Sequence, residues 1–442
     1  MNLTPKETVK YLDEYIIGQF EAKKTIAIAL RNRYRRMKLS SEMQNEIIPK
    51  NILMIGSTGV GKTEIARRLA KMMSLPFVKV EASKYTEVGF VGRDVESMVR
   101  DLAIASLNLI KNEYKEKNKE AIKGYTYKAI LEKLLPPLPK GASEEKQISY
   151  KQSYEKMKEK LILGDLDNSM IEVEIHQGLN ELGNDSNTNP EIIKVQESFM
   201  KILNAGQNSI KKEMSVKEAK EALKIEAAEK IFDNDAIKRD ALKRAENGGI
   251  IFIDEIDKIA VASNSQGRQD PSKEGVQRDL LPIVEGSSVS TKLGTLNTDH
   301  ILFIAAGAFH LSKPSDLIPE LQGRFPLRVE LNSLDENILY KILTQPKNSL
   351  LKQYEELLKT ESVTLIFEDE SIRAIAKIAH LANEKTEDIG ARRLHTIIEK
   401  VIEDISYSAD EYKNEIVKIT AKLVHEKLDN IIENEDTARY IL

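Results

Sequence analysis

The sequence predicts an α/β protein, with a parallel sheet and flanking helices, that is interrupted by a mostly helical insertion and followed by a mainly helical C-terminal domain. The first observation is a set of short apolar runs at 52–55, 77–80, 250–253 and 301–304. Runs of this kind are typical of strands buried on both faces of a parallel sheet. The second is that helical patterns alternate with these runs. The third is the long charged stretches of residues 102–246.

The length of the chain indicates how many domains to expect. A chain of 442 residues suggests roughly three domains at about 150 residues each. We expect an α/β domain at 1–101 and 247–331, an insertion domain at 102–246, and a C-terminal small domain at 332–442. Further expected features are a polar linker at 183–190, a helix-opening capping box at 215–218, a helix over 371–382, and a strand pair at 363–366 and 416–419.

Charge and composition exclude several classes of protein. Lysine and arginine number 66 against 70 aspartates and glutamates, which leaves a formal net charge of −4. This balance argues against nucleic acid or a membrane surface as the main partner. The absence of cysteine excludes disulfides, thiolate metal sites and cysteine nucleophiles. We see no secretory signal and no run of roughly 18 apolar residues that would span a membrane, so we expect a cytoplasmic protein.

A phosphate-binding loop follows the first expected strand. Residues 56–63 read Gly-Ser-Thr-Gly-Val-Gly-Lys-Thr and match the pattern GxxxxGK[ST]. They lie between a strand and a helix, where backbone N–H groups and the helix N-terminus favour phosphate oxygens. Lys62 is expected to reach the β- and γ-phosphates, and the Thr63 hydroxyl to ligate Mg²⁺.

Two carboxylates follow the apolar strand at 250–253. The carboxyl ends of parallel strands form the edge of the sheet where ligands bind. We therefore expect Asp254 to hold Mg²⁺, directly or through water, and Glu255 to orient and deprotonate an attacking water. Asp257 and Lys258 are interpreted as the polar start of a helix.

Three groups of basic residues have an ordinary structural interpretation on the residues alone. The run at 31–38 suggests nucleic-acid contact, but the solvated face and C-terminal end of a helix is the favoured interpretation in a chain without a basic balance. Arg324 follows a turn between a helix and a strand and is interpreted as structural. Arg392 and Arg393 open an apolar helix and are interpreted as solvated.

Together these motifs resemble the AAA+ ATPases, and in finer detail the HslU (ClpY) family of Clp-type unfoldases, over the whole chain. Residues 15–19, Tyr-Ile-Ile-Gly-Gln, are similar to the family segment that packs over adenine, and 390–392, Gly-Ala-Arg, resemble the second-sensor motif. Three positions depart from the pattern. Ser57 replaces a usual proline, Phe90 replaces a usual tyrosine, and residues 305–308 offer no polar first-sensor side chain.

The resemblance implies ATP hydrolysis, with ATP and Mg²⁺ as cofactors. It implies nucleotide contacts at the positions that match the family motifs: Ile17, Gly59, Val60, Gly61, Lys62, Thr63, Glu64, Asp254, Glu320 and Arg392. Thr63 and Asp254 would hold Mg²⁺. Arg324 would be an arginine finger that reaches the nucleotide of a neighbouring subunit, and with Lys62 and Glu255 it would complete the catalytic set. Such a finger is worth roughly 10³–10⁵ in rate in other phosphoryl-transfer systems.

The resemblance also implies partners. Members of the family form rings, so we expect a homo-hexamer that unfolds protein substrates and translocates them into an HslV-like threonine peptidase ring. The insertion is expected to handle incoming substrate. Two further segments match the family's pore loop and its protease-docking tail: Gly89, Phe90, Val91 and Gly92, and Arg439, Tyr440, Ile441 and Leu442.

Three other functions compete with this one. A ClpX-like unfoldase would begin with a cysteine-ligated zinc domain, which a chain without cysteine cannot form, and would lack the large insertion. A nucleic-acid motor of the RuvB kind fits poorly with the near-neutral charge and the pore aromatic. A scaffold that binds ATP only as a switch would not need the catalytic set of Lys62, Asp254, Glu255 and Arg324.

Overall fold

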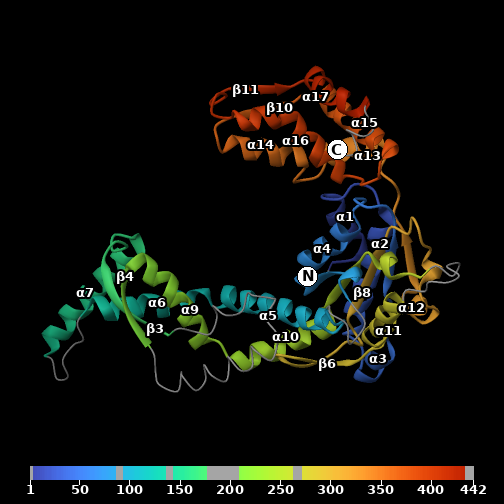
Figure 1. Ribbon diagram of the computed structural model, residues 1–442. Coiled ribbons are helices and arrows are strands. Elements are labelled where there is room, and N and C mark those ends of the chain that lie inside the picture. Colours follow the sequence, from blue (N-terminus) through green and yellow to red (C-terminus); the bar gives the residue numbers. More distant parts are fainter. Residues whose placement is uncertain (1–2, 86–92, 136–142, 177–208, 262–270, 434–442) are drawn as a thin grey trace. The chain divides into compact units, whose positions relative to one another are not determined.

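The computed structural model describes residues 3–85, 93–135, 143–176, 209–261 and 271–433. The chain divides into two compact units. The first comprises Met1–Leu109 and Arg239–Leu442, and the second comprises Ile110–Lys238. Helices α5 (Ser97–Lys117) and α10 (Asn234–Gly248) begin in one unit and end in the other (Figure 1).

A five-stranded parallel sheet forms the centre of the first unit, which confirms the α/β fold class. The strands lie in the order β2-β5-β8-β1-β9, and every neighbouring pair is parallel. Their bounds are β1 Ile52–Ile55, β2 Phe77–Glu81, β5 Ile250–Asp254, β8 Leu302–Gly307 and β9 Leu327–Glu330. The first four match the expected strands. The sequence pattern does not predict β9, because this edge strand mixes apolar and charged residues.

Alternate residues of the strands pack into two separate hydrophobic clusters. Ile52, Met54, Phe252 and Ile304 face a cluster with residues of α1 (Pro5–Asp13), α2 (Phe20–Arg36) and α4 (Lys62–Met72). Leu53, Ile251, Ile253 and Phe303 face a cluster with residues of α5, α11 (Pro271–Glu285) and α12 (Pro319–Arg324). The sheet is therefore covered by helices on both faces, which explains its continuous apolar strands.

The remaining elements of the first unit are short strands and the C-terminal helices. Two further elements precede the C-terminal helices. They are helix α3 (Ser41–Glu46) and the hairpin of strands β6 (Ser288–Thr291) and β7 (Gly294–Asn297). The C-terminal elements are α13 Glu336–Thr344, α14 Leu350–Lys359, β10 Thr364–Phe367, α15 Asp369–Lys385, α16 Arg392–Tyr407, β11 Ile416–Ile419 and α17 Ala421–Glu433. The expected strand pair, β10 with β11, is confirmed, and so is the helix over 371–382.

In its described residues, the second unit contains helices and one antiparallel pair of strands. Its elements are α6 Lys119–Leu134, α7 Glu144–Leu163, β3 Met170–His176, β4 Ser209–Ser215 and α9 Val216–Ile231. The Ser215 capping box opens α9 as expected, with the Glu218 N–H donating to Ser215 Oγ at 3.3 Å. The antiparallel strand pair β3–β4 packs against α6 and α9 (Figure 1) and is not among the elements expected from the sequence. The linker at 183–190 lies outside the described residues.

The basic run does form the C-terminal end of a helix, as expected, but two of its arginines are buried, which corrects its interpretation as a solvated face. Arg33 donates to the carbonyl oxygens of Gly249 at 3.0 Å and His300 at 2.6 Å. Arg36 donates to the carbonyl oxygen of Gln44 at 2.7 Å. Burial lowers the pKa of both guanidinium groups. Arg33 binds the segments that lead into β5 and β8, and Arg36 binds α3, so both arginines belong to the core of the fold.

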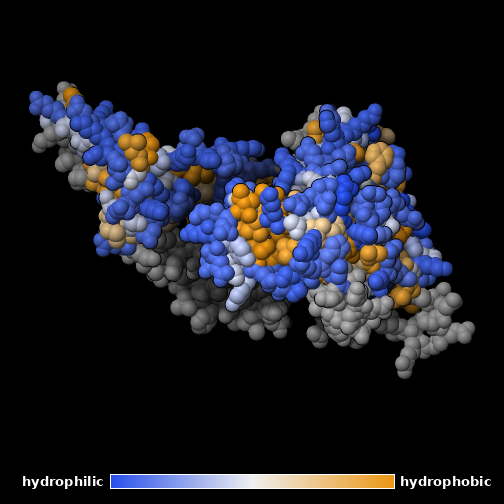
Figure 2. All heavy atoms as spheres, turned by 90° about the horizontal axis from the view of Figure 1, so that it is seen from above, coloured by the Kyte–Doolittle hydropathy of each residue, from blue (hydrophilic) through white to orange (hydrophobic). Residues whose placement is uncertain are grey.

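The surface is mixed in character. On the face seen in Figure 2, most of the surface is hydrophilic and hydrophobic residues form separate patches. Within the ranges that the structure describes, no helix combines the length and the apolar character that a membrane crossing needs.

Candidate functional site

The phosphate-binding motif forms the loop between β1 and α4. Gly59 and Gly61 have φ angles of +77° and +100°, a conformation that glycine adopts without a steric penalty. Val60 between them is buried. The N–H of Gly56 donates to the carbonyl oxygen of Gly307 in β8 at 3.2 Å. These features fix a curled backbone of the kind that binds phosphate.

The Lys62 side chain lies folded over this loop. Its Nζ donates to the carbonyl oxygen of Ser57 at 2.7 Å and to that of Gly56. Burial lowers the pKa of the Lys62 ammonium, and the carboxylates of Asp254 and Asp257 oppose that shift. The Glu64 carboxylate is bound by Arg67 and Arg68 at 2.7 and 2.6 Å, so only the backbone of Glu64 is available to a phosphate.

Asp254 ends β5 within reach of the loop. Its Oδ2 lies 3.4 Å from Thr63 Oγ1 and 2.8 Å from Lys79 Nζ. The structure thus brings together Thr63 and Asp254, as the sequence predicts. Lys79, on the neighbouring strand β2, is a residue of this site that sequence analysis does not identify. The sequence feature that could have identified Lys79 is its charge inside the otherwise apolar run 77–80.

These side chains fit a magnesium ion. Mg²⁺ takes oxygen ligands and is usually bound through one or two protein groups, with substrate phosphates and waters completing its shell. Thr63 and Asp254 supply one hydroxyl and one carboxylate of that kind. Across the described ranges, no group of three or more histidine, aspartate or glutamate side chains could hold a metal ion. A metal at Thr63 and Asp254 would therefore need ligands from the nucleotide.

Glu255 lies exposed beside Asp254 in a strained backbone conformation. Its φ is +55°, its N–H donates to Asp254 Oδ1 at 3.1 Å, and its Oε2 lies 3.5 Å from Ser83 Oγ. For a residue with a side chain, this conformation costs on the order of 1–3 kcal/mol and is typical of functional sites. Gln19 and Phe309, which flank the same site, also have positive φ.

Asp257 binds the backbone of a distant segment, which corrects its interpretation as only the polar start of a helix. In the 3-10 turn Ile256–Ile259 its Oδ2 accepts from the Phe309 N–H at 3.2 Å. If Gly307 were replaced by a residue with a side chain, the new Cβ would lie 2.9 Å from Asp257 Oδ1. Asp257 therefore ties the segment after Glu255 to the end of β8, next to the phosphate-binding loop.

The second-sensor turn lies directly on the phosphate-binding loop. The Ala391 N–H donates to the carbonyl oxygen of Gly59 at 3.3 Å. A Cβ at Gly59 would lie 2.0 Å from the carbonyl oxygen of Ile389, and one at Gly390 would lie 2.6 Å from that of Thr58. Neither glycine can be replaced in this arrangement without displacing backbone.

The two arginines after this turn have different environments. Arg392 is exposed at the start of α16, and its charge is among the causes, after burial, that lower the pKa of Lys62. Arg393 is buried and donates to Asn383 Oδ1 at 3.2 Å and to Thr386 Oγ1 at 2.7 Å. The solvated interpretation is therefore wrong for Arg393, which holds the turn in place.

The segment expected to contact the base lies between α1 and α2. Ile17 is partly exposed, whereas its neighbour Ile16 is buried. The guanidinium of Arg68, on α4, stacks over the Tyr15 ring at 4.1 Å. The Gln19 side chain donates to the carbonyl oxygen of Asn332 at 2.8 Å and accepts from its N–H at 3.0 Å. These contacts place the segment beside the phosphate-binding helix.

Arg324 and Glu320 lie exposed on the short helix α12. Arg324 forms an ion pair with Glu285 at the end of α11, with Nη2 and Oε1 2.8 Å apart. In the described part of the chain, the side-chain polar contact of Arg324 is with Glu285 and not with the phosphate-binding loop of its own chain. The structure does not bring these two residues to the loop.

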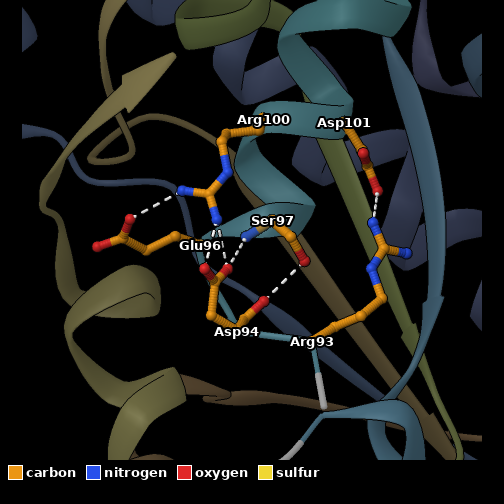
Figure 3. A network of polar contacts seen from close by, with 6 residues as sticks. All are labelled: Arg93, Asp94, Glu96, Ser97, Arg100 and Asp101. Carbon is orange, nitrogen blue, oxygen red and sulfur yellow. Dashed lines mark hydrogen bonds and ion pairs between the residues drawn. The ribbon is translucent and has the colours of Figure 1, made fainter. Parts of the chain in front are cut away.

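Residues next to the expected pore loop form a polar network (Figure 3). Arg100 binds Asp94 at 2.6 Å and Glu96 at 3.0 Å, and Arg93 binds Asp101 at 2.8 Å. On the other side of the loop, Tyr85 is buried and forms a β-bridge with Arg93. The loop residues Gly89, Phe90, Val91 and Gly92 lie outside the described residues, as do the tail residues Arg439, Tyr440, Ile441 and Leu442.

Known proteins are similar to the whole chain. The family model "ATPase family associated with various cellular activities (AAA)" matches residues 52–117, and the model "AAA domain (Cdc48 subfamily)" matches residues 170–328. The protein named ATP-dependent protease ATPase subunit HslU from Campylobacter jejuni serotype O:2 is 70% identical over 442 residues, which is 100% of both chains. The protein of the same name from Helicobacter pylori G27 is 63% identical over 442 residues, which is 100% of this chain and 99% of that one. The chain is an AAA ATPase and belongs to the HslU family of ATP-dependent protease ATPase subunits.

Proposed function

We propose that this chain forms a ring that uses ATP hydrolysis to unfold protein substrates and to translocate them into an HslV-like threonine peptidase. Family membership establishes the ATPase and its link to a protease. The observation that carries the proposal is the meeting of the phosphate-binding loop with the end of β5, where Thr63 Oγ1 lies 3.4 Å from Asp254 Oδ2 and Glu255 follows directly. A chain that used ATP only as a switch would not need Glu255 in a strained conformation at this place.

The proposed hydrolysis assigns one task to each residue of this edge. Lys62 and the N-terminus of α4 bind the phosphates, while Thr63 and Asp254 hold Mg²⁺. When bound, Mg²⁺ neutralises charge that develops on the phosphates. Glu255 orients the attacking water and accepts its proton, as a positioned carboxylate can.

We assign the remaining catalytic group to a neighbouring subunit. Arg324 is exposed, and its partner Glu285 is exposed as well. An exposed ion pair is worth at most about 1 kcal/mol, so a phosphate can displace Glu285 at little cost. Glu320, on the same short helix, would lie near that nucleotide. An arginine supplied in this way makes hydrolysis depend on the assembled ring, which we propose to be a homo-hexamer.

The second sensor would couple the nucleotide to movement. The contact between Gly390 and the phosphate-binding loop joins residues of the C-terminal domain, 332–442, to the loop. Arg392 is close enough to affect the pKa of Lys62, so a γ-phosphate bound there would attract both side chains. We propose that binding and hydrolysis swing this domain against the α/β domain, 1–101 and 247–331, and move Phe90 with the substrate. The insertion, 102–246, would receive substrate, and the cytoplasm is the proposed compartment.

Reconstitution tests this proposal. The full chain is mixed with a purified HslV-type peptidase and a folded fluorescent protein, with and without ATP. We expect fluorescence to be lost only when chain, peptidase and ATP are all present. Phe90→Ala should keep ATPase activity and lose this degradation, and deletion of residues 440–442 should abolish stimulation of the peptidase. ATP hydrolysis without any stimulation of the peptidase by the full chain would contradict the proposed partner.

A further inference from the structure

Lys23 is a buried charged residue that the proposed mechanism does not use. It lies on α2 with 1% of its side chain exposed and is among the largest fully buried side chains of the described residues. Lysine is almost never fully buried without a partner, because removing an ammonium from water costs several kcal/mol. A lysine in this position therefore needs a reason beyond filling space.

The Lys23 ammonium holds the loop between α1 and α2. Its Nζ donates to the carbonyl oxygen of Ile16 at 2.5 Å and to Asp13 Oδ1 at 2.7 Å. The Ile16 N–H donates to the carbonyl oxygen of Leu12 at 2.8 Å. Both backbone polar groups of Ile16 are thus fixed, one by the end of α1 and the other by Lys23.

The next residue, Ile17, has the opposite character. Among the described residues, no hydrogen-bond partner is found for the backbone N–H or C=O of Ile17. Just beyond it, Gln19 fixes the chain again through Asn332. Ile17 and Gly18, for which no backbone hydrogen bond is found in the described structure, therefore lie between two residues that are fixed, Ile16 and Gln19.

The free backbone N–H and C=O of Ile17 provide one hydrogen-bond donor and one hydrogen-bond acceptor at a fixed separation. The Watson–Crick edge of adenine offers an acceptor and an amino donor, whereas the edge of guanine reverses that pattern. A site built to hydrogen-bond one pattern discriminates strongly against a ligand that leaves its polar groups unpaired. The orientation of the Ile16–Ile17 peptide would thus decide which base is accepted.

We propose that Lys23 is a positioning residue for base selection: by binding the Ile16 carbonyl, it orients the backbone of Ile17 so that adenine is preferred over guanine. This inference rests on the proposed contact between Ile17 and the base. A purely structural role has a different signature, because it would lower the free energy of unfolding without changing the ratio of ADP affinity to GDP affinity.

The test compares Lys23→Met with Lys24→Met in the full chain. Lys24 is the next residue on the same helix and is exposed; in the described structure it forms an ion pair with Glu21 at 3.3 Å and lies over the Phe20 ring at 5.8 Å. Dissociation constants are measured for fluorescent ADP and GDP analogues, with thermal unfolding in parallel. We expect Lys23→Met to weaken ADP binding about tenfold, to reduce the ADP/GDP preference by the same factor, and to raise KM for ATP with little change in kcat. Lys24→Met should bind as the wild type does.

Two further variants make each outcome decisive. Lys23→Gln replaces Lys23→Met in the test if the methionine variant does not fold. It keeps one hydrogen-bond donor, on a shorter side chain, and we expect the same reduction of the ADP/GDP preference. Wild-type affinity and preference in folded Lys23 variants would overturn the inference. Ile17→Pro removes the backbone N–H and so tests the underlying site: if the folded variant binds ADP as the wild type does, the proposed base contact is wrong. If Ile17→Pro weakens binding but the Lys23 variants do not, only the role of Lys23 is wrong.

Discussion

The two sets of residues that we propose to be catalytic lie in contrasting environments. Lys62, Thr63 and Asp254 meet within the chain, and the Gly390 turn packs on their loop. Arg324, by contrast, is exposed, and in the described structure its side chain contacts only Glu285. This difference supports the proposal that one chain assembles the groups for binding ATP but not all those for fast hydrolysis.

Arg324→Ala should have the largest effect on catalysis. Loss of an arginine finger costs roughly 10³–10⁵ in kcat, while nucleotide affinity should change little because Arg324 is not part of its own chain's site. Steady-state ATPase assays and nucleotide titrations measure the two quantities. Arg278→Ala is the control, since Arg278 is also exposed and, in the described structure, forms an ion pair with Glu274 within its own helix at 2.7 Å. A loss of affinity in Arg324→Ala that matches its loss of rate would argue for a role in the same subunit.

Glu255→Gln should separate binding from hydrolysis within one subunit. Removal of a general base typically lowers the rate by 10²–10⁴, whereas the side chain keeps its size and its exposed position. We expect ATP to bind as in the wild type and to be turned over very slowly in single-turnover assays. Turnover at the wild-type rate would mean that another group activates the water.

Gly390→Ala should weaken the contact between the second-sensor turn and the loop. Its Cβ would lie 2.6 Å from the carbonyl oxygen of Thr58, at a φ of +58° that disfavours any side chain. We expect ATP affinity to fall about tenfold, which corresponds to about 1.4 kcal/mol, as measured by calorimetry. Gly124→Ala is the control because no atom lies within 4 Å of its Cβ. Equal affinities in the two variants would show that the contact does not influence the nucleotide.

Arg33→Met should affect stability and leave the chemistry intact. The substitution removes two hydrogen bonds from a buried guanidinium and leaves the carbonyl groups of Gly249 and His300 without that donor. We expect a loss of about 3 kcal/mol in the free energy of unfolding, measured by denaturant titration. Arg35→Met, an exposed neighbour, should change it by less than about 0.5 kcal/mol. Similar values for the two would mean that Arg33 is not part of the core.

The sequence predicts those parts of the fold and site that depend on local patterns. Continuous apolar strands and the motif around Lys62 are such patterns, as is the pair Asp254 and Glu255. The sequence does not reveal contacts between distant segments, such as Lys79 with Asp254. The sequence also suggests that a charged residue is exposed where the structure buries it among hydrogen-bond partners. Arg33 and Arg393 read as solvated because their partners are mainly backbone carbonyls and polar side chains from loops, which leave no local pattern. The strand pair β3–β4 is missed although β3 carries a usable signal, because Ile171, Val173 and Ile175 alternate with charged residues as in a half-buried strand.

The central claim, that one subunit completes the site of another, is tested most directly by mixing two inactive variants. Lys62→Ala has a defective site and an intact Arg324, whereas Arg324→Ala has an intact site and no finger. Each variant alone should hydrolyse ATP hardly at all. If Arg324 acts on a neighbouring subunit, mixed rings should recover ATPase activity, because some intact sites receive an arginine from a Lys62→Ala neighbour. A mixture no more active than the sum of its parts would contradict the account.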